Sequence, residues 1–173
     1  ADSLYRFTSE SEQKEMRLRI YSNVAYYYYM KSAFQASVQL TEKAISLAQE
    51  LRDTLAWSDN LAQQSISYQR LGNLEMAIRT TLDGLYLDSL LQDTLRLSST
   101  YNNLAGLYLT AQRPEDGKQY IDHAIELEHS QAHPEKLSIR YGMAAELYVK
   151  LGLLPEALDF ACKAYALDMK SGD

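Results

Sequence analysis

The chain has 173 residues, of which 46% are apolar and 23% are charged, which is the composition of an ordinary folded protein. Its formal net charge of −6 disfavours nucleic acid as a partner, because the phosphates would be repelled. The apolar runs are far shorter than the ~20 residues of a membrane span. Three prolines and seven glycines are too few for an all-β protein with many tight turns, so an all-α class is expected.

A pattern with a period of 40 residues runs along the whole chain. One tyrosine recurs in every copy: Tyr28, Tyr68, Tyr108 and Tyr148. Two small positions recur after it: Ser37, Ala77, Gly117 and Ala157, then Ala44, Gly84, Ala124 and Ala164. The expected organisation is a single array with these parts: residues 1–12 as the remnant of a preceding copy, then full copies at 13–52, 53–92, 93–132 and 133–173.

Each copy is predicted to form two helices, because apolar residues recur at three- and four-residue steps on both sides of a break. The break falls four residues after the tyrosine: Ser32, Gly72, Gln112 and Gly152. Glycine there suits the left-handed position that ends a helix, and Pro114 and Pro155 fit the first turn of the next helix. One hairpin of this size cannot bury its apolar face alone, so the four hairpins are expected to stack.

Two segments carry a resemblance to a known family. "LGNLEMAI" at 71–78 and "YVKLGLLPEAL" at 148–158 resemble the helix-turn-helix signature of the tetratricopeptide repeat (TPR). The resemblance implies a right-handed α-α superhelix, a solenoid of antiparallel hairpins with a concave groove. The family's usual period is 34 residues, and the longer period here is similar to arrays in bacterial signalling proteins and some eukaryotic scaffolds.

The two termini suggest that the array continues. Asp53 and Asp93 are predicted N-caps of the following helices, and Asp173 falls in register with them, as a cap without its helix. At the other terminus, residues 3–7 align with the closing part of a second helix, residues 44–48. We therefore expect the chain to be a segment of a longer protein.

Four consecutive tyrosines stand in "NVAYYYYMKSAF" at 23–34. Four helical positions span about 300°, so the rings cannot share one face. Tyr28 is the repeated packing position and Tyr27 matches Leu107 and Leu147, so these two are expected in the core. The remaining pair, Tyr26 and Tyr29, is expected either in the concave groove or packed against the preceding partial copy.

The resemblance also implies which residues face the groove. The hypothetical peptide-binding set is Asn23, Tyr26, Tyr29, Gln63, Ile66, Arg70, Asn102, Asn103, Met143 and Glu146, with Arg19, Ser22, Asp59 and Lys150 on the same positions. Amide side chains suit an extended peptide, because they satisfy its backbone donors and acceptors. Relatives that capture chaperone tails use lysine, arginine and asparagine where this chain has Ser22, Tyr26, Ser99 and Asn103. The sequence therefore argues against chaperone-tail capture.

Residues with catalytic or metal-binding potential are few. His129 and His133 are spaced i,i+4, but Pro134 places the second at a helix boundary and no third ligand follows, so no metal is expected. Cys162 is expected to be a small apolar filler, because no base stands beside it. Phosphate-loop, zinc and protease motifs do not occur, so no cofactor and no catalytic residue is predicted.

The function expected is that of a non-enzymatic module whose groove receives an extended peptide or a partner helix. The alternative is the sensory or regulatory part of a larger bacterial signal transducer, with a histidine kinase or DNA-binding output elsewhere. Self-association through uncapped ends is a third possibility. No partner in nucleic acid or membrane is expected for this segment, and the choice between cytoplasm and periplasm stays open.

Overall fold

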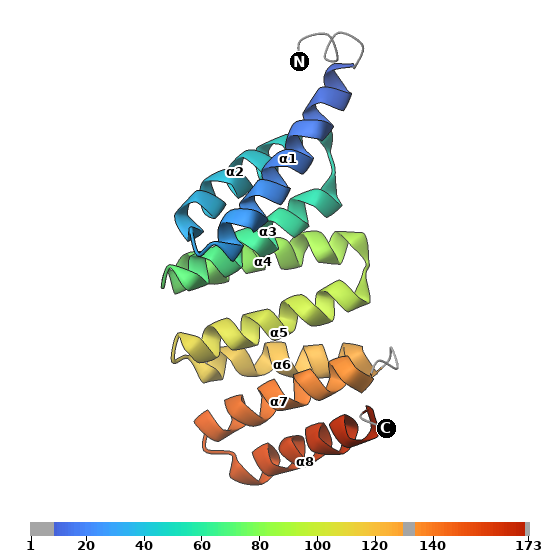
Figure 1. Ribbon diagram of the computed structural model, residues 1–173. Coiled ribbons are helices and arrows are strands. Elements are labelled where there is room, and N and C mark those ends of the chain that lie inside the picture. The colour runs from blue at the N-terminus through green and yellow to red at the C-terminus, as the bar shows by residue number, and fades with distance from the viewer. Residues whose placement is uncertain (1–8, 130–133, 172–173) are drawn as a thin grey trace. The chain divides into compact units, whose positions relative to one another are not determined.

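The protein is all-α, as predicted. The computed structural model describes residues 9–129 and 134–171 (Figure 1). These residues form eight helices: α1 (Glu10–Met30), α2 (Phe34–Leu51), α3 (Thr54–Arg70), α4 (Leu74–Leu91), α5 (Thr94–Thr110), α6 (Pro114–His129), α7 (Pro134–Lys150) and α8 (Leu154–Ser171). Consecutive helices pair as antiparallel hairpins. Helix α1 begins three residues before the expected boundary at residue 13, with Ser9 and Glu12 forming a capping box.

The chain divides into two compact units. Unit 1 ends at Leu91 and holds α1–α4, and unit 2 begins at Gln92 and holds α5–α8. In unit 1, α2 packs against both α1 and α3, and α3 packs against α4. In unit 2, α6 has the same relation to α5 and α7, and α7 packs against α8. Each unit therefore contains two hairpins and one interface between them.

The turn inside every hairpin follows the predicted break. Ser32, Gly72, Gln112 and Gly152 all have left-handed backbone, with φ of 58°, 75°, 57° and 75°. In each turn the carbonyl of the repeated tyrosine accepts a hydrogen bond from the residue after the left-handed one, for example Ala33 N to Tyr28 O at 2.9 Å. This bond satisfies a carbonyl that a helix end would otherwise leave unpaired.

The connections between hairpins were predicted in part. Asp53 accepts a hydrogen bond from the backbone of Ala56, and Asp93 accepts from the backbone amides of Leu95 and Arg96, so both are N-caps as expected. The preceding residues Arg52 and Gln92 are also left-handed, with φ of 56° and 54°, which no glycine in the sequence signalled. The expected cap Asp173 and the aligned residues 3–7 lie outside the described residues.

Small residues allow close approach where the hairpins stack. A methyl group added to Gly117 of α6 would come within 2.9 Å of Leu147 Cδ1 on α7. At the equivalent place in unit 1, Ser67 of α3 donates a hydrogen bond to Ser37 of α2 at 3.0 Å. Leu147 and its equivalent Ser67 thus face the second helix of the preceding hairpin in the same unit.

This geometry corrects the expectation for two tyrosines. Tyr27, the equivalent of Leu147, is 55% exposed, and Tyr28 is 38% exposed, whereas Tyr108 and Tyr148 are buried. Among the described residues no hairpin precedes α1. The rings of Tyr27 and Tyr28 therefore face solvent on the side where a preceding hairpin would pack. Equivalence in the repeat predicted the position correctly but not its burial.

A set of hydrogen bonds, buried in the second and third hairpins and partly buried in the fourth, was missed by the sequence analysis. Ser58 donates to Asp88 at 2.6 Å and Ser98 donates to Glu128 at 2.7 Å, and Ser138 donates to Asp168 in the same way. These pairs join the two helices of a hairpin at equivalent positions. The residues do recur at the 40-residue period, so the signal was present in the sequence.

Candidate functional site

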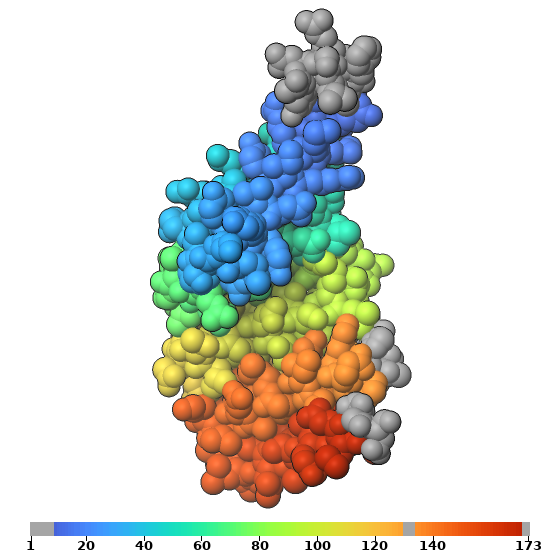
Figure 2. Space-filling view, in the orientation of Figure 1, coloured from blue at the N-terminus to red at the C-terminus, as the bar shows by residue number. Residues whose placement is uncertain are grey.

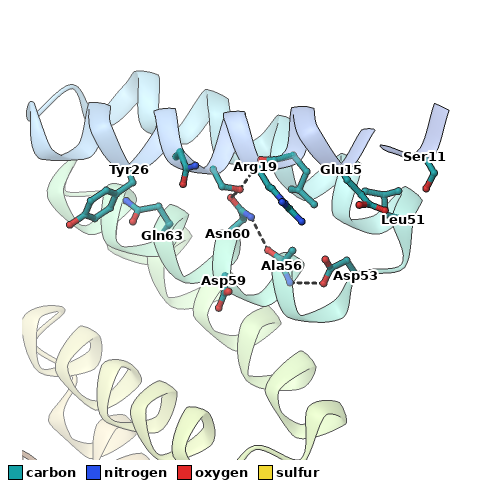
Figure 3. Close-up of a pocket in the computed structure, with 13 residues that line it drawn as sticks. Ser11, Glu15, Arg19, Tyr26, Leu51, Asp53, Ala56, Asp59, Asn60 and Gln63 are labelled. Atoms are coloured by element: carbon teal, nitrogen blue, oxygen red, sulfur yellow. Dashed lines mark hydrogen bonds between the residues drawn. The ribbon is translucent and has the colours of Figure 1, made fainter. Parts of the chain in front are cut away.

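A cleft of about 710 Å³ lies in unit 1 between the first helices of its two hairpins, α1 and α3 (Figure 3). Helix α1 supplies one wall: Ser11, Glu15, Leu18, Arg19, Ser22, Asn23 and Tyr26. The other wall comes from the end of α2, the turn after it and α3: Leu51, Asp53, Ala56, Asp59, Asn60 and Gln63. The wall residues of α1 recur at three- and four-residue steps, so one face of the helix runs along the whole cleft.

Hydrogen bonds fix the middle of the cleft. Ser22 donates to Asn60 Oδ1 at 3.0 Å, which ties α1 to α3. The amide of Asn60 donates to the carbonyl of Ala56 at 2.8 Å, and Asp53 holds the start of α3 (Figure 3). Asn60 is almost fully buried and both ends of its amide are paired, so it serves the structure of the wall.

Gln63 differs from Asn60 in this respect. Its Nε2 atom is buried and has no hydrogen-bond acceptor among the described residues. Such an unpaired donor costs about 1–3 kcal/mol, which an incoming acceptor such as a peptide carbonyl can recover. The side chain stands at one end of the cleft beside Tyr26 (Figure 3).

Tyr26 provides an aromatic surface at the same end. Its ring is 55% exposed and stacks on Tyr29, with the ring centroids 6.5 Å apart. Tyr29 in turn contacts Phe34 of α2 at 5.7 Å. Tyr29 therefore supports Tyr26 from behind, and the ring available to a ligand is that of Tyr26.

Charged side chains stand toward the other end of the cleft. Glu15 and Arg19 lie one turn apart on α1, and Asp59 is exposed on α3 (Figure 3). The cleft thus combines both signs of charge with amides and an aromatic ring. This mixture suits a polar, extended ligand more than a compact apolar one.

The predicted groove residues are brought together in part. Asn23, Tyr26 and Gln63 line the cleft, as do Arg19, Ser22 and Asp59. Ile66 and Arg70 of α3 are not among its lining residues. Ser11, Glu15 and Asn60 were missed, although Glu15 and Ser11 extend the face of Arg19 by one and two turns.

In unit 2 the corresponding positions look different. Met143 of α7 lies against Gly106 of α5, so closely that a methyl group on the glycine would be 3.2 Å from Met143 Cε. Gly106 and Met143 are the equivalents of Tyr26 and Gln63. Asn102 is half-buried, and its Oδ1 is unpaired among the described residues. Asn103 and Glu146 are exposed.

Catalytic and metal-binding groups were also located. Within residues 9–129 and 134–171 no group of three histidine, cysteine or acidic side chains could hold a metal ion. The ring of His129 is hydrogen-bonded to the hydroxyl of Tyr141 at 2.7 Å, and His133 lies outside the described residues. Cys162 is exposed on α8, so the expectation of an apolar filler was wrong. The Cys162 side chain faces solvent because no described helix covers this side of α8.

Comparison with known proteins identifies the fold. No family model and no curated protein matches the chain. Solved structures do match. BtubC (BKLC) from P. vanneervenii is 18% identical with a TM-score of 0.85, and the match covers 92% of this chain and 66% of that chain. The apo form of RapI is 16% identical with a TM-score of 0.87, and the match covers 99% of this chain and 61% of that chain. A Signal Transduction ATPase with Numerous Domains from Pyrococcus horikoshii is 20% identical with a TM-score of 0.82, and the match covers 94% of this chain and 25% of that chain.

Those structures are longer than this chain, which spans between a quarter and two thirds of their lengths. No helix in the described part of the chain is both long and apolar enough to span a bilayer. At these identities the likeness concerns the fold alone. The chain is a TPR-like helical repeat of sequential antiparallel hairpins.

Proposed function

We propose that this chain is a non-enzymatic binding module that takes an extended peptide segment of a partner protein. TPR-like repeats are generally protein-interaction modules, and the cleft between α1 and α3 is the surface that we assign to the peptide. The remaining groove positions, including Tyr29, Ile66, Arg70, Asn102, Asn103, Met143 and Glu146, are proposed as secondary contacts. No catalytic residue is assigned.

The observation that carries the proposal is the unpaired amide of Gln63 beside the exposed ring of Tyr26. A peptide laid along α1 offers a carbonyl every ~3.3 Å, and one of them would accept from Gln63 Nε2 after a rotation of the side chain exposes this buried atom to the cleft. Tyr26 would cover an adjacent side chain with a large apolar area at low entropy cost. Glu15, Arg19 and Asp59 would favour peptides that carry side chains of opposite charge farther along the cleft.

The test uses a fluorescent peptide selected on the 173-residue chain from a random-sequence display library, with affinity measured by anisotropy. Tyr26→Ala and Gln63→Ala are each expected to weaken binding about tenfold or more, the cost of a hot-spot contact. Matched controls lie outside the cleft, because Tyr27→Ala removes an equally exposed ring and Gln39→Ala removes an exposed amide on α2. Equal losses in variants and controls would overturn the assignment.

A second candidate is a regulatory segment of a larger signal transducer. The observation that favours it is the similarity to a protein described as a signal-transduction ATPase with a tetratricopeptide repeat sensor, of which this chain would match a quarter. In that case peptide binding would be the input to another domain. Sequencing the gene on both sides of this segment tests it: an output domain in the same reading frame is expected, and its absence would remove the candidate.

A further inference from the structure

Unit 1 has a second pocket, of about 600 Å³, among α2, α3 and α4. Three aromatic rings and two carboxylates line it, those of Trp57, Tyr68, Tyr86, Glu42 and Asp83, and we call it the ring pocket. In Figure 2, atoms of α2 (light blue) and α4 (green) are seen at the surface of unit 1. Rings and carboxylates around one space are the groups that attract an organic cation.

Two of the three rings have no aromatic counterpart in the other copies of the repeat. The residues at the position of Trp57 are Arg17, Leu97 and Leu137, and those at the position of Tyr86 are Ser46, Glu126 and Ala166. The stacking of hairpins therefore does not require an aromatic residue at either place. Trp57 packs against the buried cluster that contains Ala44 and Ala48, so its ring is held in position.

The open side of the ring pocket is a property of the repeat. Tyr86 is 65% exposed on α4. Its equivalents Ser46 on α2 and Glu126 on α6 are also exposed, although α3 and α7 pack against those two helices. A hairpin packed in the usual way thus leaves this position accessible.

Unit 2 shows what the equivalent ring and carboxylate hold. Tyr148 and Asp122 stand at the positions of Tyr68 and Glu42. The ammonium group of Lys118 contacts both, 2.7 Å from Asp122 Oδ2 and 5.0 Å from the ring centre of Tyr148. Asp122, and after it Tyr148, raise the pKa of Lys118, because they stabilise its charged form.

Unit 1 has this ring and carboxylate without the lysine. Val38 stands at the position of Lys118 and is buried. Burial, and after it the charge of Glu42, raise the pKa of Tyr68, so the carboxylate acts on this ring. Neither Glu42 nor Asp83 has an ion-pair partner in the described part of the chain.

We propose that the ring pocket binds a lysine side chain of a basic partner protein. The ammonium group would pair with Glu42 and meet the ring of Tyr68, as Lys118 does with its two partners in unit 2. Asp83 and Tyr86, three residues apart on α4, supply a second carboxylate and a second ring. The formal net charge of −6 favours the approach of a basic segment.

The ring pocket is separate from the peptide cleft. None of the residues that line the cleft lines the ring pocket, because α3 turns different faces to the two sites. The inference therefore does not rest on the peptide-binding proposal, and either can fail while the other holds.

Trp57 provides the readout, because it is the sole tryptophan of the chain and lines the ring pocket. The probe is Nα-acetyl-lysine methylamide, titrated into the 173-residue chain at constant ionic strength while tryptophan fluorescence is recorded. A saturable change in the millimolar range is expected for a single side chain in an open pocket. The norleucine analogue keeps the carbon chain but lacks the ammonium group, and it is expected to produce no such change.

Two variants test the groups that we assign to the cation. Glu42→Gln and Tyr86→Ala are each expected to weaken binding of the lysine probe about threefold to tenfold, the effect of one charge pair or one cation–π contact. Both side chains are exposed, so folding should survive, which circular dichroism verifies. Glu50→Gln on α2 and Tyr27→Ala on α1 are the controls, because they remove an exposed carboxylate and an exposed ring outside the pocket.

Three outcomes would overturn the proposal. The first is a fluorescence that the lysine probe leaves unchanged, and the second is an equal response to the norleucine analogue or equal losses in variants and controls. The third comes from the matched arginine amide, which is included because Arg113 lies 5.1 Å from the ring centre of Tyr108, another copy of the repeated tyrosine. Tighter binding of this amide than of the lysine probe would assign the pocket to a guanidinium group.

Discussion

Units 1 and 2 contain the same pair of hairpins but pack them with different chemistry. The interface between hairpins in unit 1 is rich in hydroxyl and amide groups, such as Ser37 with Ser67 and Ser22 with Asn60. In unit 2 the same interface holds Leu147 against Gly117 and the buried ion pair of Arg140 with Glu128, 3.6 Å apart. The backbone repeat therefore leaves both the size and the polarity of the side chain at each position free to vary.

The difference extends to the candidate site. In unit 1, Gln63 and Tyr26 leave an open cleft, whereas in unit 2 Met143 lies over Gly106 at the equivalent place. A flexible thioether fills such a space well. Two units of one fold thus offer one polar cleft and one apolar, filled contact, because the side chains at these positions differ.

The largest expected effect separates two equivalent tyrosines. Tyr108→Ala should lower the free energy of unfolding by about 3–5 kcal/mol, because Tyr108 is buried and stacks on Tyr120 with centroids 5.5 Å apart. Tyr28→Ala should cost about 1 kcal/mol, since this ring is more than a third exposed. Urea unfolding of both variants measures the difference. Equal losses would contradict the explanation given for the exposure of Tyr28.

The next effect concerns the buried charge of unit 2. Arg140→Leu should destabilise the protein by about 2–4 kcal/mol, because Glu128 would stay buried without its cation. Burial lowers the pKa of the Arg140 guanidinium, which indicates that desolvation already opposes its charge. The equivalent change in unit 1, Asn60→Leu, removes one neutral partner of Ser22 and should cost about 1 kcal/mol.

A second substitution makes the Arg140 prediction specific. Adding Glu128→Gln to Arg140→Leu should restore part of the lost stability, because the buried group becomes neutral while Ser98 can still donate to it. Chemical unfolding of the double variant gives the answer. If the double variant is less stable than Arg140→Leu alone, the stability loss does not come from an unpaired charge.

A smaller effect is expected at the close approach of α6 and α7. Gly117→Ala should cost about 1–2 kcal/mol, since overpacking against Leu147 exceeds the gain of up to ~1 kcal/mol in helix propensity. Ser37→Ala, at the equivalent position of unit 1, loses one hydrogen bond and should cost about 0.5–1 kcal/mol. Leu147→Ala should make room, so Gly117→Ala should cost less in its presence, which a double-mutant cycle measures.

Helices, turns and caps could be predicted because they depend on local chemistry. The left-handed break after each tyrosine and the caps Asp53 and Asp93 were recognised from single residues and their spacing. Part of the cleft lining was also anticipated, since the resemblance to TPR arrays implied that Arg19, Asn23 and Gln63 face a groove. These features need no knowledge of how the hairpins meet.

The remaining features depend on neighbours that the sequence does not reveal. The exposure of Tyr27 follows from the absence of a described hairpin before α1, and that of Cys162 from the uncovered side of α8. The pairing of Arg140 with Glu128 joins two hairpins through an arginine that has no charged counterpart in the first two copies, which have Ile20 and Asn60 at this position. Repeat equivalence alone could not predict it.

The smallest effect on stability sharpens the comparison of the two units most directly. Gln63→Met gives unit 1 the residue that unit 2 has at this position, and it removes a buried donor without an acceptor among the described residues. Stability should change by no more than about 0.5 kcal/mol or rise slightly, because the lost amide contributes no hydrogen bond. Anisotropy with the selected peptide should nevertheless show a loss of binding of about tenfold or more, since the carbonyl loses its donor and the thioether occupies the cleft. Unchanged affinity would mean that the peptide does not use Gln63, and the open cleft of unit 1 would then be a difference of packing without a role in recognition.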